Sequence, residues 1–213
     1  MSDTPYSLST RRGLLGGALA LAASPALAQR RRVVTMLGDS ITAGLGLPAS
    51  AALPAQLQRE LTRIGSPAAV RGAGVSGDTT GGGLARVDFS VQRDTDVCVV
   101  ALGANDLLRG LDPKTTRANL EKIVARLKAR KIKVVLAGIQ APVAVGGSYA
   151  RDFNAVFPAV ARSQGVTLHP DFLSGVFRIP RLNQRDGIHP NAEGVKIVAR
   201  NLAPAVAKVL GRS

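Results

Sequence analysis

Only two histidines occur in the chain, His169 and His189, so any chemistry that needs an imidazole base has two candidates. Asp186 stands three residues before His189, and Pro190 follows it. This spacing can place the carboxylate on the Nδ1 side of the imidazole and leave Nε2 free for a nucleophile. An acid at this spacing is also a common surface coincidence, so the pair alone does not establish catalysis. His169 has no such partner, which favours a structural role.

A serine directly follows the first β-favouring run, in the segment Gly38-Asp39-Ser40. At a strand-to-helix turn, Ser40 would lie at the carboxyl edge of a sheet with its backbone N–H available to an anion. By position alone, a serine at a helix N-cap is the simpler interpretation. The chain has no Gly-x-Ser-x-Gly segment, which excludes the nucleophile elbow of the α/β-hydrolases.

Two further polar positions follow the next two expected strands, Gly77 after the second and Asn105 after the third. A glycine lets its backbone N–H approach a ligand closely, and an asparagine amide donates hydrogen bonds without carrying charge. Each residue alone is typical of a turn. Together with Ser40 they would supply three donors around one point, as an oxyanion hole requires.

The elements that must position these residues alternate regularly along the chain. Short β-favouring or apolar runs predict strands at 32–37, 68–75, 96–102, 133–139 and 166–168. Apolar stripes and capping residues predict helices over 50–64, from about 79 past 87, and over 115–130, 150–162 and 192–210. This alternation predicts one doubly wound α/β domain with a five-stranded parallel sheet. In such sheets the site lies at the carboxyl ends of the strands, where all the motifs above fall.

The first 28 residues are interpreted as a cleaved export signal, which leaves residues 29–213 as the folded domain. Arg11 and Arg12 precede an apolar stretch that ends in Ala26-Leu27-Ala28, the pattern of a secretory signal. The arginine pair resembles a twin-arginine signal, so we expect a periplasmic or secreted protein. The apolar stretch spans only 15 residues, whereas a membrane helix needs about 20. We therefore expect no stable membrane anchor after cleavage.

Composition narrows the classes of partner. An apolar content of 46% excludes wholesale disorder. The formal net charge is +14, but the basic residues are scattered and tryptophan is absent, which argues against nucleic-acid binding. The single cysteine, Cys98, excludes an internal disulfide, and its apolar surroundings predict a small buried side chain. No Cys/His group has zinc-ligand spacing, so we expect no metal.

Four segments in order resemble the conserved blocks of the SGNH (GDSL-type) hydrolase family, and in detail its thioesterase/lysophospholipase/arylesterase branch. The segments are Gly38-Asp39-Ser40, Ser76-Gly77-Asp78-Thr79, Gly103-Ala104-Asn105-Asp106 and Asp186-Gly187-Ile188-His189-Pro190. The resemblance covers the chain from Val33 to the last helix. It implies a three-layer α/β/α sandwich of flavodoxin-like type and no cofactor. One departure is visible: an asparagine that the branch carries shortly before the glycine of the second block is Gly72 here.

Carried over position by position, the resemblance makes Ser40 the nucleophile, His189 its base and Asp186 the acid that orients the base. It makes the Ser40 N–H, the Gly77 N–H and the Asn105 side chain the oxyanion donors. The expected partner is a small-molecule ester, with acyl thioesters or lysophospholipids as further substrates. The sequence makes no prediction of oligomeric state.

Three other functions compete with this interpretation. The segment 72–77 matches the Gly-x-Gly-x-x-Gly dinucleotide fingerprint, which would indicate a nicotinamide or flavin oxidoreductase. However, the segment follows the second strand rather than the first. A carbohydrate O-deacetylase of the same family is the main alternative, although few aromatic side chains are available as sugar platforms. The loops 107–113 and 141–145 are aliphatic instead, which favours an acyl or small aryl group. The third alternative is a non-enzymatic protein that binds the cell envelope through its positive net charge.

Overall fold

The computed structural model describes residues 1–2 and 30–211. The expected export signal therefore lies, apart from its first two residues, outside the described residues. The domain that begins at Arg31 forms a single unit by its internal contacts. Within the part of the chain that the structure describes, no helix is both long and apolar enough to cross a bilayer.

Five parallel strands form the sheet, as predicted. They are β1 (Val33–Gly38), β2 (Ala69–Gly74), β3 (Val97–Ala101), β4 (Lys133–Ala137) and β5 (Thr167–His169), in the order β2-β1-β3-β4-β5. All residues of β1 and β3 are buried, which explains their continuous apolar runs, because both faces of a parallel sheet are covered.

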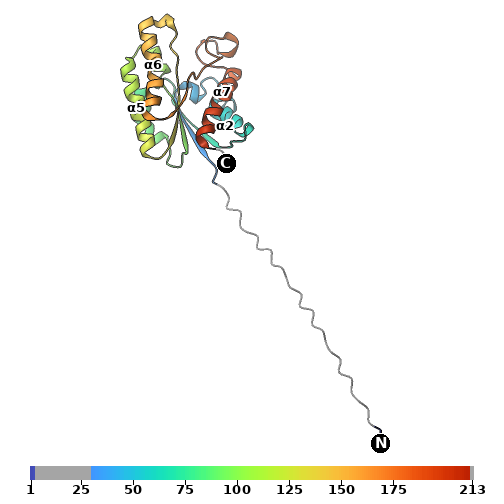
Figure 1. Cartoon of the computed structure of the whole chain (residues 1–213). Helices are drawn as coiled ribbons and strands as arrows, with labels where there is room; N and C mark the ends of the chain where they lie inside the picture. Colours follow the sequence, from blue (N-terminus) through green and yellow to red (C-terminus); the bar gives the residue numbers. More distant parts are fainter. Residues whose placement is uncertain (3–29, 212–213) are drawn as a thin grey trace. The chain divides into compact units, whose positions relative to one another are not determined.

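Helices cover both faces of this sheet and complete the expected three-layer sandwich (Figure 1). On one face, α2 (Leu53–Arg63) packs against α7 (Ala192–Leu210). On the other face, α5 (Pro113–Ala129) lies between α3 (Thr80–Ser90) and α6 (Gly147–Gln164). The fold class is therefore confirmed, and α7 has the bounds that its apolar stripe predicted.

Several short elements were not predicted. They are α1 (Ser40–Ala43), α4 (Ala104–Leu108) and the 3₁₀ helices η1 (Ala49–Ala51), η2 (Val143–Val145) and η3 (Pro180–Leu182). Segments of three to five residues are too short to show an apolar period, so a sequence pattern does not reveal them. The most consequential one is α4, because it carries Asn105, which the sequence suggested to be a turn residue.

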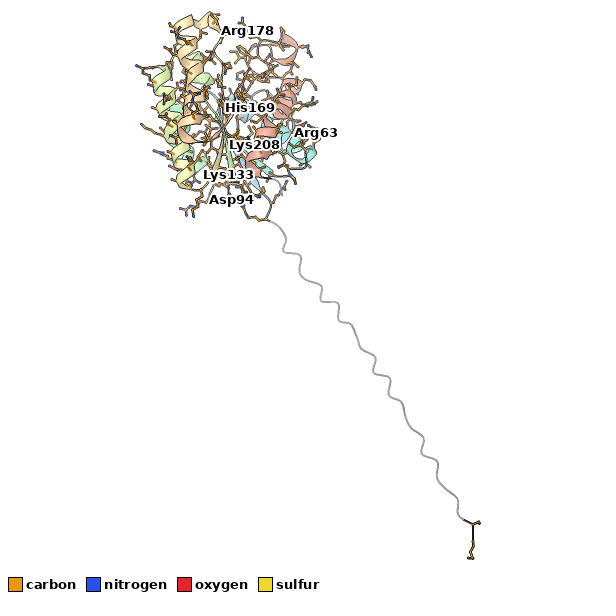
Figure 2. All side chains as sticks on the ribbon, in the orientation of Figure 1. Arg63, Asp94, Lys133, His169, Arg178 and Lys208 are labelled. Carbon is orange, nitrogen blue, oxygen red and sulfur yellow. The ribbon has the colours of Figure 1, made fainter. Side chains whose placement is uncertain are left out.

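The two ends of the sheet have different roles. Lys133, the first residue of β4, and Asp94, just before β3, lie at one end of the domain, and Arg178, in the loop after β5, lies at the other (Figure 2). The second end is the carboxyl edge, where the four sequence motifs lie. There the last residue of β1, Gly38, pairs with Gly74 of β2 and Ala101 of β3, so these three strands end level with one another.

Glycines allow the chain to pack closely at this edge. A Cβ on Gly74 would lie 2.3 Å from the Ala43 backbone nitrogen and 2.7 Å from the Asp39 carbonyl oxygen. Both distances are shorter than real Cβ contacts allow, so only glycine lets the end of β2 contact the serine-bearing turn. Gly72, the position that departs from the family pattern, lies within β2 rather than in the following loop.

Cys98 is buried, as the sequence predicted. Cys98 is fully buried in β3, and burial raises the pKa of its thiol to about 12. It therefore packs as a small apolar side chain, as its surroundings in the sequence indicated.

Candidate active site

Ser40 lies where β1 gives way to α1, and it is 8% exposed. The interpretation of Ser40 as a helix cap is wrong: Asp39 is the N-cap, and its Oδ1 accepts a hydrogen bond of 3.0 Å from the Ile41 N–H. Ser40 is instead the first residue of the helix, a position whose N–H has no acceptor within the helix. Its backbone N–H and its hydroxyl are both left for other partners.

The hydroxyl of Ser40 is hydrogen-bonded to His189, 149 residues further along the chain. Ser40 Oγ lies 2.8 Å from His189 Nε2, and His189 Nδ1 lies 2.6 Å from Asp186 Oδ2. An ionised carboxylate can only accept hydrogen bonds, so Nδ1 of His189 carries the proton facing Asp186. In the neutral imidazole Nε2 is then the acceptor and the serine hydroxyl the donor. This is the geometry of a serine activated by a base.

Asp186 stays ionised because its own loop stabilises the charge. The N–H groups of His189 and Ile188 donate to Asp186 Oδ1 at 3.0 and 2.9 Å. These two bonds, together with the bond from the His189 side chain, lower the pKa of Asp186 to about 2. The spacing of three residues thus lets one carboxylate hold both the backbone and the ring of the histidine.

The histidine loop is tied to the serine turn by Gln184. Its backbone N–H donates to the His189 carbonyl at 2.8 Å, and its side-chain amide donates to the Leu45 carbonyl, also at 2.8 Å. Leu45 in turn donates its N–H to the Ser40 carbonyl at 3.0 Å. This side chain therefore connects the loop that carries the base to the turn that carries the serine.

Gly77 and Asn105 are linked through Asp78, the residue that directly follows Gly77. Gly77 has a φ of 80°, a left-handed conformation that favours glycine, and among the described residues no backbone carbonyl accepts its N–H. Asn105 Nδ2 donates to the Asp78 carbonyl at 2.9 Å. One amide hydrogen of Asn105 is used in this bond, which orients the side chain and leaves the second hydrogen for another acceptor.

His169 ends β5 and takes no part in these contacts. Its Nε2 is buried without a hydrogen-bond partner in the described part of the chain. Burial lowers the pKa of this imidazole below its ordinary value, and the nearby Asp171 charge opposes the shift. Burial therefore favours the neutral form of His169, and within the described part of the chain no hydrogen bond joins it to Ser40.

Two charged residues to which the sequence analysis assigned no role support the site. Asp106 is fully buried and accepts hydrogen bonds from the Thr80 N–H at 2.8 Å, the Thr80 hydroxyl at 2.5 Å and the Thr116 hydroxyl at 3.1 Å. It joins the starts of α3 and α5 to α4. Arg86 contacts both β1 and β2 from α3. The motifs pointed to neither role, because these partners come from other elements.

An apolar cavity of about 270 Å³ opens beside Ser40 and His189. Their chain neighbours Ile41 and Ile188 both line it. The remaining lining residues are Ala104, Leu107, Leu108, Ile139, Gln140, Pro142, Val145, Asp171, Leu173 and Phe177. The two aliphatic loops that the sequence suggested as cleft walls both contribute, whereas the segment 171–177 was not expected. No group of three or more His, Cys, Asp and Glu that could hold a metal ion occurs among the described residues.

A parallel α/β sandwich with a serine, a histidine and an aspartate in hydrogen-bond contact at its carboxyl edge defines a serine hydrolase. Comparisons with known proteins specify the family. The model of the GDSL-like lipase/acylhydrolase family matches residues 36–197, and the chain belongs to this family. The expected SGNH (GDSL-type) resemblance is thereby confirmed, and with it an enzyme that acts on ester bonds.

Individual relatives agree with this assignment. Esterase TesA of Pseudomonas aeruginosa is 38% identical over 200 residues, which cover 92% of this chain and 98% of the relative. Thioesterase 1/protease 1/lysophospholipase L1 of Escherichia coli is 38% identical over 165 residues, 77% of this chain and 78% of the relative. The crystal structure of AlinE4, an SGNH-hydrolase family esterase, matches with a TM-score of 0.71 and 42% identity, covering 85% of this chain and 97% of AlinE4.

Asp39 is a buried carboxyl group next to the serine, and it should make stability depend on pH. It is 3% exposed, and burial raises its pKa from 3.8 to about 6, against the opposing effects of the Ile41 N–H and His189. Between these two values the folded protein holds a proton that the unfolded chain has lost. Stability from this group therefore falls as the pH rises from about 4 to about 6 and stays lower above that range.

We predict that Asp39→Asn stabilises the protein at pH 8 by about 1–3 kcal/mol and changes stability little at pH 4. Asparagine keeps an oxygen that can accept the Ile41 N–H but carries no charge to bury. Urea unfolding of both proteins at the two pH values measures the difference. Asp39→Ala, which loses the cap, should destabilise at pH 4, where the carboxyl is neutral. An equal effect of Asp39→Asn at both pH values would contradict the assignment.

Proposed function

We propose that this protein hydrolyses carboxylic esters by two-step acyl transfer at Ser40. Ser40 Oγ bonds to the ester carbonyl carbon while His189 Nε2 takes the hydroxyl proton, and the alcohol leaves with that proton. His189 then takes a proton from water, whose oxygen attacks the acyl-serine; the bond from the acyl carbon to Ser40 Oγ breaks, Ser40 regains the proton from His189, and the acid is released. Asp186 holds the imidazole and stabilises its charged form. The observation that carries the proposal is the unbroken line of short hydrogen bonds from Ser40 to His189 to Asp186.

The charge that develops on the carbonyl oxygen would be stabilised by three donors. These are the N–H of Ser40 at the start of α1, the N–H of Gly77 and the second amide hydrogen of Asn105. All three lie in the segments that follow β1, β2 and β3, which end level at the same edge. Because Asn105 is already held by the Asp78 carbonyl, its amide needs no reorganisation when the oxyanion forms.

The cavity beside Ser40 supports an acyl or small aryl group as the bound part of the substrate. Its lining is mostly aliphatic, and Phe177 is the one aromatic side chain among the described residues that line it. Sugar rings are usually bound on aromatic platforms, so the lining favours the esterase over a carbohydrate O-deacetylase. The names of the relatives, an esterase and a thioesterase/lysophospholipase, support testing oxygen esters, thioesters and lysophospholipids side by side.

The decisive experiment is a chain-length series of p-nitrophenyl esters, with acyl thioesters, lysophospholipid and an acetylated sugar in parallel. The protein should turn over p-nitrophenyl esters, and a phosphonate probe should label Ser40. Ser40→Ala should lose about 10³-fold or more in kcat, because the nucleophile is removed. His169→Ala is the matched control and should keep its turnover. Full activity in Ser40→Ala would end the proposal, and turnover of the acetylated sugar alone would favour the deacetylase.

Filling the cavity should shorten the acyl chains that the enzyme accepts. Ala104 lines the cavity at the start of α4, so the larger side chain of Ala104→Leu would occupy part of the acyl space. We expect kcat/KM for octanoate relative to acetate to fall about 10-fold or more, since one methylene in an apolar pocket changes discrimination by this order. Ala155→Leu, on an exposed position of α6, should leave the ratio unchanged. An unchanged ratio in Ala104→Leu would place the acyl group elsewhere.

We further propose that residues 1–28 direct export and are removed, which would leave residues 29–213 in the periplasm or medium. The proposal is supported by the arginine pair, the apolar stretch and the small residues before position 29. Replacing Arg11 and Arg12 with lysine should hold the protein in the cytoplasm if the twin-arginine route is used. Cell fractionation followed by esterase assay measures this, with the unchanged chain as control. An unaltered distribution would assign export to another route.

A further inference from the structure

Arg86, on α3, donates four side-chain hydrogen bonds close to the candidate site. Its Nε donates to Asp78 Oδ2 at 2.7 Å, its Nη2 to the Gly38 carbonyl at 2.8 Å, and its Nη1 to the Ala73 carbonyl at 2.9 Å. Nη1 also reaches the Ser90 hydroxyl at 3.1 Å. The side chains of Arg86 and Asp78 are only 19% and 13% exposed. Such a set requires the planar, five-donor guanidinium, which a lysine does not supply.

These contacts connect the segments that carry the proposed oxyanion donors. Gly38 is the last residue of β1 and precedes the Asp39-Ser40 turn, and Ala73 lies one residue before the end of β2. Asp78 follows Gly77 directly. One guanidinium therefore fixes the spacing between the serine turn and the loop that presents the Gly77 N–H.

Asp78 is hydrogen-bonded to both Arg86 and Asn105 and therefore connects the two residues. Its carboxylate is held by Arg86, its backbone N–H donates to the Val75 carbonyl at 3.1 Å, and its carbonyl accepts from Asn105 Nδ2 at 2.9 Å. The orientation of the Asn105 amide thus depends on a residue whose own position depends on Arg86. The Val75 N–H also donates to the Gly38 carbonyl at 3.1 Å, so the loop after β2 is bonded directly to the end of β1.

We propose that Arg86 is the positioning residue of the oxyanion hole, acting through Asp78 on Asn105 and Gly77. This inference rests on the proposed function and adds to it a residue outside the four sequence motifs. Misplacing donors or reacting groups by about 1 Å can cost roughly 10²-fold in rate. The effect should fall on kcat, because oxyanion donors bind the transition state more strongly than the ground state.

A purely structural role would give a different result, and the chain offers a matched control. Arg130, at the end of α5, is similarly enclosed, with 23% of its side chain exposed, and it likewise donates to a backbone carbonyl, that of Val91. It also lies 3.7 Å from a carboxylate, that of Asp88. Val91 and Asp88 lie at the far end of α3 from Thr80. Loss of Arg130 should therefore lower stability without changing kcat per folded molecule.

The test is a double-mutant cycle between Arg86→Met and Asn105→Ala, assayed on one p-nitrophenyl ester. Asn105→Ala should lose about 10²–10³-fold in kcat. Arg86→Met should lose about 10–10²-fold in kcat, with little change in KM. The double variant should lose clearly less than the product of the two single losses, because part of the effect of Arg86 passes through Asn105 and only the part that passes through Gly77 remains. Arg130→Met should keep the wild-type kcat while its Tm falls.

Two conservative variants keep the proposal testable if Arg86→Met folds poorly. Arg86→Lys should keep a positive charge near the Asp78 carboxylate but lose the contacts with the Gly38 and Ala73 carbonyls. Asp78→Asn should weaken the interaction between residues 78 and 86 by removing the negative charge. Both should lower kcat with KM nearly constant. A lower Tm with unchanged kcat in these variants, or losses that multiply fully with Asn105→Ala, would overturn the proposal.

Failure of the proposed function would give a separate result. If phosphonate does not label Ser40 in the unchanged protein, the serine mechanism itself is wrong. If Ser40 is labelled but Asn105→Ala keeps its kcat, the esterase stands, and the positioning role of Arg86 through Asn105 is rejected.

Discussion

The functional contacts depend on the register in which β1 pairs with its two neighbours. Gly38 lies opposite both Gly74 and Ala101, so three strands end level and the loops that follow begin at the same edge. Parallel strands without this register would separate the serine turn from the segments with Gly77 and Asn105. The register is maintained by burial: β1 and β3 are buried at every residue, and a slipped strand would expose apolar side chains.

The carboxyl edge is also where the protein buries charge. Asp39, Asp106 and Arg86 are enclosed there; Asp39 accepts a hydrogen bond within its own turn, and the other two are bonded to other elements. Burying a charged group costs free energy unless its partners compensate for the lost water. The raised pKa of Asp39 shows that its compensation is incomplete. This edge therefore combines preorganised polar groups with a local loss of stability, as is common at catalytic sites.

The histidine is held differently from Ser40, Gly77 and Asn105, because it does not lie just after the end of a strand. It lies in the loop before α7, which is held by the bridge between Asn183 and Pro190 and by hydrogen bonds that Gln184 donates. Asp186 completes the loop by accepting from two backbone N–H groups as well as from the imidazole. The serine and its base thus come from separate supports, which are joined by the Ser40–His189 hydrogen bond and by the Gln184 amide.

The sequence by itself determined the alternation of elements, the parallel sheet, the family and the residues that meet at the site, because apolar periodicity and short motifs are local patterns. It also indicated the spacing by which Asp186 holds His189. The tertiary structure alone decided that Asp39, not Ser40, caps α1, that Asn105 lies on a helix, and that Arg86 joins β1 to β2. The role of Arg86 depends on a partner 48 residues away, the Gly38 carbonyl. Residue types alone do not encode which distant carbonyl or N–H will lie within hydrogen-bond distance once the strands are paired.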